Sequence, residues 1–305
     1  MNLSVLPEDL EPTFRGFLTG HGGAPLAYAR WDHPEPRGRV VISPGYGEHG
    51  ERYRHTACWL HRQGWAVTSI DHLGFGRSGG IRGDAQGIRP AVADLVQLLH
   101  HERLQDARDG APRRPQVLLG HSFGGLLSLL ALLWHPETLD GLVLSAPAVA
   151  LRAIPLPLRL LAKAMHLAAP HRPVPVKGDK GQVCSDPVLV QRYWDDPLCH
   201  HLVTAAFLAA LEEGREELLP MGAELERPIL LLEAGADTVA DPDGAEPLWE
   251  AVRPSLLERH RLEGFYHEIF HDRRRAEAEA LAEGWLNRLF PVPAGTLALP
   301  AATLN

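Results

Sequence analysis

The sequence predicts an α/β fold, in which helices flank both faces of a mostly parallel central sheet. Short runs rich in leucine or β-branched residues alternate with longer stretches of helical periodicity, which is typical of this class. Several short runs, such as residues 40–42, 117–119 and 229–232, are apolar almost throughout. Strands of a parallel sheet have this composition because both of their faces are covered. The 305 residues are enough for one large domain, or for a core domain with an insertion.

Strands and helices follow one another along most of the chain. Leucine-rich or β-branched runs predict the strands, and apolar residues at helical spacing predict the helices. In order, we expect strands at 26–31 and 39–43, a helix at 51–62, a strand at 65–70, a helix at 90–102, a strand at 116–119, a helix at 123–134 and a strand at 141–145. Further on, we expect strands at 228–233 and 257–262 and helices at 245–252 and 273–289.

Between Pro147 and Glu226 the strand patterns stop, which predicts an inserted helical subdomain. This stretch holds proline-rich segments at 154–157 and 171–175 and apolar-periodic segments at 158–168 and 202–211. We therefore expect a core of residues 1–147 and 225–290, a helical cap of residues 148–224, and a loose tail at 291–305, which has no charge and no clear period.

Composition and charge argue against several classes of protein. Hydrophobic residues make up 45% and charged residues 22% of the chain, so neither disorder nor a collagen-like repeat is expected. The net charge of −8 argues against a nucleic-acid partner, and the three cysteines, without a CxxC pair, indicate neither disulfides nor structural zinc. Residues 1–12 lack a signal-peptide pattern, and the longest apolar stretch, 126–134, is too short for a bilayer. The expected location is the cytoplasm, peripheral at membranes if the cap touches them.

Gly120-His121-Ser122-Phe123-Gly124 matches the G-x-S-x-G nucleophile elbow, and its context makes the match specific. A buried strand runs directly into the motif, and an apolar helix runs directly out of it. The tight turn between them strains the serine backbone and exposes the hydroxyl, while the glycines remove side chains that would clash. Ser122 is therefore the candidate nucleophile.

Two further glycine motifs overlap at residues 74–80. Gly76-Arg77-Ser78-Gly79-Gly80 repeats the G-x-S-x-G pattern, but the preceding strand has already ended and no apolar helix follows, so we expect Ser78 to be a turn residue. Residues 74–79 also match G-x-G-x-x-G, with Asp94 downstream. A dinucleotide site needs such a loop to open a helix, and the glycines and prolines that follow argue against it.

His267-Glu268-Ile269-Phe270-His271 matches H-E-x-x-H, the pattern of zinc peptidases. A zinc site needs both histidines one turn apart on a helix, plus a third ligand. Here Gly264-Phe265-Tyr266 precedes the motif and the convincing helix begins only near Asp272. We therefore expect His267 to lie in a loop after a strand and no metal to be bound there.

Asp237 lies in a turn directly after the strand expected at 228–233. An aspartate in a turn is by default a turn former, but this one lies at a strand end, between the candidate serine and the loop histidine. Asp241 is the alternative. Ser122, Asp237 and His267, each just beyond a strand, follow the chain order of α/β-hydrolases.

In these and other motifs the sequence resembles the α/β-hydrolase superfamily, and within it the monoacylglycerol lipase and lysophospholipase group. The matching segments run in the family's order over residues 14–290. They are 45–49 with Arg52 and Tyr53, 71–78, 120–125, 196–198, the Asp237 turn and 264–268. One departure is Pro44, where the family usually has a histidine; this changes the bracing of the oxyanion loop.

The resemblance implies acyl transfer without a metal or an organic cofactor. His267 takes the proton of Ser122 and later protonates the leaving alcohol, while Asp237 fixes the imidazole tautomer. The backbone N–H groups of Tyr46 and Phe123 bind the oxyanion. The inserted cap covers the carboxyl ends of the strands.

We therefore expect a serine carboxylic-ester hydrolase that acts on a single-acyl lipid, monoacylglycerol or lysophospholipid. By the same resemblance, Glu48 and Arg52 line the polar pocket for the head group, with a surface salt bridge as the alternative. Leu160 and Met165 belong to an apolar cap that holds the acyl chain, faces a membrane or packs onto the core. The alternative function is a general short- to medium-chain carboxylesterase; less favoured are a zinc peptidase and a non-catalytic interaction protein.

Overall fold

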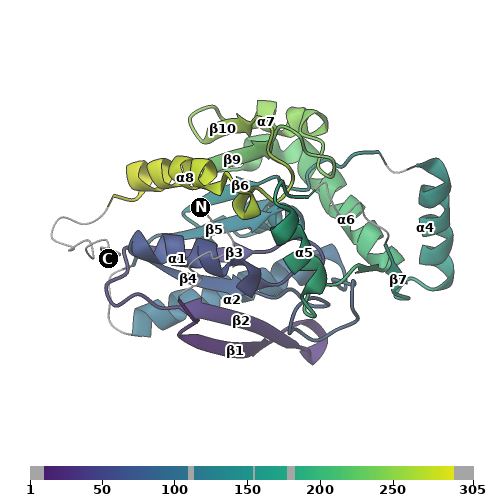
Figure 1. Cartoon of the computed structure of the whole chain (residues 1–305), viewed down its shortest axis with the longest axis horizontal. Helices are drawn as coiled ribbons and strands as arrows, with labels where there is room; N and C mark the ends of the chain where they lie inside the picture. The colour runs from purple at the N-terminus through teal and green to yellow at the C-terminus, as the bar shows by residue number, and fades with distance from the viewer. Residues whose placement is uncertain (1–9, 109–112, 154, 177–182, 292–305) are drawn as a thin grey trace.

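An eight-stranded sheet forms the centre of the computed structural model, which describes residues 10–108, 113–153, 155–176 and 183–291 (Figure 1). Its strands lie in the order β1-β2-β4-β3-β5-β6-β9-β10. Their bounds are β1 Phe14–Thr19, β2 Pro25–Trp31, β3 Gly38–Ser43, β4 Trp65–Ile70, β5 Gln116–His121, β6 Gly141–Ser145, β9 Ile229–Ala234 and β10 Leu257–Leu262. The strands from β4 to β10 pair in parallel, whereas β2 is antiparallel to β4 and β1 to β2.

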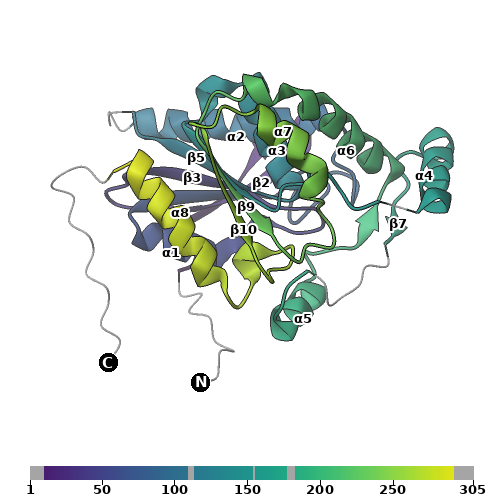
Figure 2. The ribbon, with the colours of Figure 1, turned by 90° about the horizontal axis from the view of Figure 1, so that it is seen from above.

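Helices cover both faces of the sheet. Helices α1 (Arg54–Arg62) and α8 (Arg275–Leu289) lie on one face, and α2 (Ile88–Arg108), α3 (Phe123–Trp134) and α7 (Glu246–Ala251) lie on the other (Figure 2). The apolar core is divided accordingly into two clusters, one under each layer of helices. The α/β class predicted from the sequence is confirmed, because the central strands are buried on both faces as their apolar runs require.

Strand β1 and the short helix α5 (Pro187–Asp195) were not predicted from the sequence. Strand β1 is an edge strand whose residues are partly or fully exposed, so it lacks the apolar run that marks the inner strands. The helix predicted at 51–62 begins as a 3-10 turn, Gly50–Tyr53, before α1. The strand predicted at 116–119 continues through His121 as β5.

The chain leaves the sheet after β6 and returns at β9. Between them lie α4 (Leu156–Ala168), β7 (Val174–Pro175), α5, β8 (Leu202–Val203) and α6 (Ala205–Leu218). Helix α6 packs on α2 and α3, whereas α4 packs on α6, has no buried residue and stands away from the sheet in both views (Figures 1 and 2). Because residues 148–150 and α6 are packed with the core, the boundaries 148–224 of a separate cap stay a prediction.

The start of the insertion is fastened to the loop that follows β9. Leu151 forms an isolated antiparallel bridge with Ala240. On either side of it, Asp241 N donates to Ala150 O at 2.9 Å and Arg152 N donates to Val239 O at 3.0 Å. We call this pair of hydrogen-bonded segments, 150–152 and 239–241, the neck of the insertion.

None of the described helices is both long and apolar enough to cross a membrane. Of the tail expected at 291–305, all but Pro291 lies outside the described residues.

Candidate active site

Ser122 stands on a sharp turn between β5 and α3. Its backbone has φ +51° and ψ −117°, a conformation that residues with a side chain rarely adopt. The surroundings leave no room for other side chains: a Cβ at Gly124 would lie 2.1 Å from Ser43 O, and one at Gly120 would lie 2.3 Å from Ser128 Oγ. The sequence G-x-S-x-G is therefore what allows the turn.

Three side chains from three strand ends form one chain of hydrogen bonds at this turn. Ser122 Oγ lies 2.8 Å from His267 Nε2, and His267 Nδ1 lies 2.8 Å from Asp237 Oδ2. All three residues are buried, with Ser122 only 8% exposed. The geometry suits proton transfer from the hydroxyl to the imidazole, with the carboxylate fixing the ring.

Asp237 is held as a carboxylate by the loop after β9. Its Oδ1 accepts hydrogen bonds from Val239 N and Ala240 N, at 2.8 and 2.9 Å. Burial raises the pKa of Asp237, but the hydrogen bond from His267 and these two N–H groups outweigh it and hold the pKa below its ordinary value. Asp241, the alternative from the sequence, forms an ion pair with Arg152 at 3.5 Å instead.

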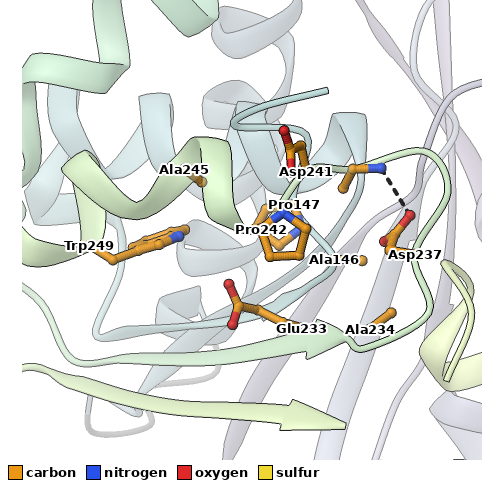
Figure 3. A pocket seen from close by; sticks show the side chains of 10 residues that line it. Ala146, Pro147, Glu233, Ala234, Asp237, Asp241, Pro242, Ala245 and Trp249 are labelled. Carbon is orange, nitrogen blue, oxygen red and sulfur yellow. Dashed lines mark hydrogen bonds between the residues drawn. The ribbon is translucent and has the colours of Figure 1, made fainter. Parts of the chain in front are cut away.

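Asp237 also borders a small cavity, whose volume of about 10 Å³ is close to the least that holds one water molecule (Figure 3). Glu233, Asp241 and Trp249 are among its other lining residues. Glu233 is paired with Arg259 at 2.8 Å. Asp237 thus both lines this cavity and is hydrogen-bonded to His267.

The loop that carries Tyr46 runs beside the serine. A Cβ at Gly45 would lie 3.3 Å from Ser122 Cβ and 3.0 Å from the His121 ring. The Tyr46 hydroxyl donates to Leu202 O at 2.5 Å, and its ring packs against Phe75 and Phe207. Phe123 is the first residue of α3, and the first N–H groups of a helix have no intrahelical partner. The structure therefore brings both expected oxyanion donors to the neighbourhood of Ser122.

Segment 193–203 of the insertion packs on this loop, through contacts that the sequence did not identify. His200 N donates to Gly47 O at 2.9 Å, and the His200 ring stacks on Phe75. His49 Nε2 lies 2.9 Å from an oxygen of Asp196, in the 196–198 segment that the sequence resemblance had included. The backbone contacts of His200 have no signature in the sequence.

Glu48 and Arg52, expected to bind a head group, pair with each other, and Arg52 also pairs with Glu268. Arg52 forms ion pairs with Glu48 and with Glu268, the latter at 3.0 Å. Burial disfavours the Arg52 cation, but the two carboxylates raise the pKa of Arg52 well above its ordinary value. The interpretation of residues 267–271 as an H-E-x-x-H motif gave no indication that Glu268 pairs with Arg52.

The remaining residues of that motif also have protein partners. Residues Ile269–His271 form a single 3-10 turn, and His271 Nε2 donates to Arg52 O at 3.2 Å. Among the described residues, the one group with donor atoms close enough to share a metal is His49, Asp196 and Cys199, which lies outside the motif.

The glycine motifs at 74–80 form a turn in which Ser78 is buried. Ser78 Oγ accepts from Ala27 N at 2.7 Å and donates to Asp71 O. Asp94 accepts from His21 N at 2.8 Å. After Gly79 the chain reaches its next helix only at Ile88. Ser78 therefore fixes this turn to the neighbouring backbone, and Asp94 fixes the backbone at His21.

Leu160 and Met165 lie on α4, apart from the triad. Leu160 is 59% exposed and Met165 is half-buried. Leu156, Leu158, Leu161 and Leu167 on the same helix are also exposed, so these leucines do not pack the cap onto the core.

Comparison with known proteins gives a consistent result. The family model Hydrolase_4, described as serine aminopeptidase, S33, matches residues 34–274. The chain is 32% identical over 259 residues to a monoacylglycerol lipase of Mycolicibacterium smegmatis, covering 84% of this chain and 90% of that protein. It is 30% identical over 271 residues to the monoglyceride lipase of Rattus norvegicus, covering 87% of each. The crystal structure of the Paleococcus ferrophilus monoacylglycerol lipase superimposes with a TM-score of 0.77 at 28% identity, covering 87% of this chain and 99% of that one.

Proposed function

The chain belongs to the α/β-hydrolase family of these lipases and is a carboxylic-ester hydrolase, and from this premise we propose that it cleaves single-acyl lipids, monoacylglycerol or lysophospholipid. The observation that carries the proposal is the Ser122–His267–Asp237 chain of 2.8 Å hydrogen bonds at a serine of positive φ. The activity named for the relatives, monoacylglycerol or monoglyceride lipase, supports the class of substrate.

The reaction proceeds through an acyl-enzyme. His267 accepts the Ser122 proton as Oγ attacks the ester carbonyl, and the N–H groups of Tyr46 and Phe123 bind the oxyanion that forms. His267 then gives the proton to the leaving alcohol, which is glycerol from a monoacylglycerol and the glycerophosphodiester from a lysophospholipid. Water, activated by the same imidazole, releases the fatty acid and regenerates Ser122. Asp237 stabilises the imidazolium in both steps.

Helix α4 is proposed to contact the lipid surface from which the substrate comes. Its exposed leucines, with Arg159 and Lys163, give it the composition of an interfacial helix, apolar with basic residues. Such contact is peripheral, since it uses one helix lying on the surface.

A hydrolysis panel tests the proposed substrate. We expect the highest kcat/KM for medium- or long-chain monoacylglycerol or lysophosphatidylcholine, because each buried methylene adds about 0.8 kcal/mol of binding. Acyl p-nitrophenyl esters of graded length serve as the comparison. A preference for acetate or butyrate esters would assign a short-chain carboxylesterase, and cleavage of aminoacyl p-nitroanilides without ester cleavage would assign a peptidase.

A further inference from the structure

Glu48, Arg52 and Glu268 form a buried ionic cluster, which we call the clasp, between the Tyr46 loop and the His267 loop. Their side chains are only 3%, 8% and 10% exposed. Burying three charges is unfavourable unless they are closely paired and hydrogen-bonded. Here both oxygens of each carboxylate accept hydrogen bonds from protein groups, so the clasp is internally satisfied.

At one end, the clasp holds the backbone of the Tyr46 loop. Glu48 Oε1 accepts the N–H of Gly45 and, at 2.8 Å, the hydroxyl of Tyr53, while Oε2 accepts from Arg52. Gly45 immediately precedes Tyr46, whose N–H is the proposed oxyanion donor. Because Gly45 lies against Ser122, a shift of the Glu48 carboxylate moves the donor relative to the nucleophile.

At the other end, the clasp holds the loop of the catalytic histidine. Glu268 follows His267 directly, and its carboxylate accepts from both terminal nitrogens of Arg52, at 3.3 and 3.0 Å. Arg52 O in turn accepts from the His271 ring. From the insertion, the Tyr193 ring lies 4.6 Å from the guanidinium carbon, and Val183 O accepts from Glu268 N at 2.7 Å. Arg52 therefore ties two catalytic loops together beneath α5.

We infer that Glu48, Arg52 and Glu268 are positioning residues, which fix the Tyr46 N–H against the Ser122–His267 pair. The inference rests on the proposed function. An oxyanion donor is effective only within about 2.7–3.1 Å of the developing charge. A displaced donor weakens the transition state but not the ground state, so kcat falls while KM is unchanged, whatever alcohol the ester carries.

Glu48→Gln and Glu268→Gln test the clasp, with Glu51→Gln as the matched control. Glu51 lies in the same 3-10 turn as Arg52 and pairs with Arg15, Arg54 and Arg77. Its replacement by glutamine therefore removes a similarly paired charge from the same segment. For each protein, kcat and KM are measured on a 1-monoacylglycerol and on the p-nitrophenyl ester of the same acid. Active sites are counted with a fluorophosphonate, and the inhibition constant of an acyl trifluoromethyl ketone is measured.

We expect Glu48→Gln to lower kcat about 10- to 100-fold on both esters, with KM within about twofold of the wild type. Trifluoromethyl ketone binding, which forms an oxyanion on the enzyme, should weaken by the same factor. Glu268→Gln should act in the same direction, and the active-site count of both variants should equal that of Glu51→Gln and the wild type.

Three results would overturn the inference. A raised KM confined to the monoacylglycerol would make Glu48 a head-group ligand. If kcat falls only because fewer active sites react with the fluorophosphonate, and the trifluoromethyl ketone binds the remaining sites as tightly as in the wild type, the role of the clasp is purely structural. Wild-type kcat and KM in both Gln variants would show that the clasp does not contribute to catalysis. A wild type that hydrolyses neither ester would instead refute the proposed function, leaving the clasp without a reaction to serve.

Discussion

Ser122 is strained, and the surrounding backbone holds it in place. Its N–H donates to Ser145 O at 3.1 Å, and its carbonyl accepts from Leu126 N and Ala148 N at 3.1 and 2.9 Å. A residue in such a backbone region costs about 1–3 kcal/mol, which persists only where neighbouring hydrogen bonds enforce it. The strain is thus borne by β5, β6 and α3 together, and it turns the hydroxyl toward His267.

Replacing Ser122 by alanine should abolish labelling by a fluorophosphonate probe, because the probe reacts with the activated hydroxyl. Ser78→Ala, which alters the second G-x-S-x-G motif, should keep full labelling, since Ser78 Oγ is occupied by the backbone of Ala27 and Asp71. Gel fluorescence after labelling measures both. Labelling that persists in Ser122→Ala would refute the assignment of the nucleophile.

Asp237→Asn should lower kcat by about 10⁴-fold, because an amide favours the wrong imidazole tautomer. Asp241→Asn, four positions along the same loop, should remain within about tenfold of the wild type, since Asp241 pairs with the exposed Arg152 and not with His267. Steady-state hydrolysis of a p-nitrophenyl ester distinguishes them. The reverse pattern would move the acid to Asp241.

The sequence could predict that Ser122, Asp237 and His267 lie together, but not the clasp. Ser122, Asp237 and His267 each follow a strand, and parallel strands end at one edge of a sheet, so chain order was enough to bring them together. Arg52 and Glu268 are 216 residues apart, and although Glu268 adjoins His267, Arg52 lies in the 3-10 turn before α1 and not at a strand end. Their pairing depends on the three-dimensional course of two loops, which no local pattern encodes.

At the scale of elements, the helices α4 and α5 differ in what the sequence could indicate about them. The leucine-rich period of α4 predicted a helix correctly but not its exposure, because an apolar face looks the same whether it meets a core or a lipid surface. Helix α5 has a weaker apolar pattern, yet Asp186 caps it by accepting from Val188 N, and Pro187 follows. The pair Asp186-Pro187 could therefore have indicated where this helix begins.

Leu160→Asp and Leu167→Asp on α4 should reduce binding to phosphatidylcholine–phosphatidylglycerol vesicles and lower kcat/KM for dispersed long-chain monoacylglycerol, by about tenfold each. Hydrolysis of dissolved p-nitrophenyl butyrate should not change, because α4 stands apart from the triad. Leu104→Asp is the matched control, an exposed leucine on α2. Equal losses on both substrates would show that α4 supports folding rather than the interface.

At the scale of the whole molecule, several histidines are buried in the fold, among them His55, His72, His121 and His271. Burial lowers the pKa of His55 and His72 to about 4 and that of His121 to about 3, with the nearby His267 adding to the shift of His121. Burial and the Arg52 charge also lower the pKa of His271 well below 6.5. The folded chain keeps these rings neutral at pH values where the unfolded chain protonates them.

The free energy of unfolding should therefore be greatest above pH 6.5 and decrease as the pH falls from 6.5 toward 4. In that window only the unfolded chain takes up the protons, and each histidine removes on the order of 1–2 kcal/mol by pH 5. Urea unfolding between pH 5 and 7.5 measures the slope. His55→Gln should flatten it, and His166→Gln, at an exposed position on α4, should not. A pH-independent stability would contradict the neutral assignments.

The neck of the insertion has a consequence for how such enzymes diversify. Because 150–152 and 239–241 are hydrogen-bonded to each other, the segment between β6 and α6 begins at a point fixed by the core itself. The backbone of Val239 and Ala240, which holds the Asp237 carboxylate, belongs to the same pairing. Recombination can therefore exchange residues beyond Arg152 for an unrelated sequence while the acid keeps its geometry. A transplanted segment would still have to restore the contacts that residues 183–203 make with the Tyr46 loop and with the clasp.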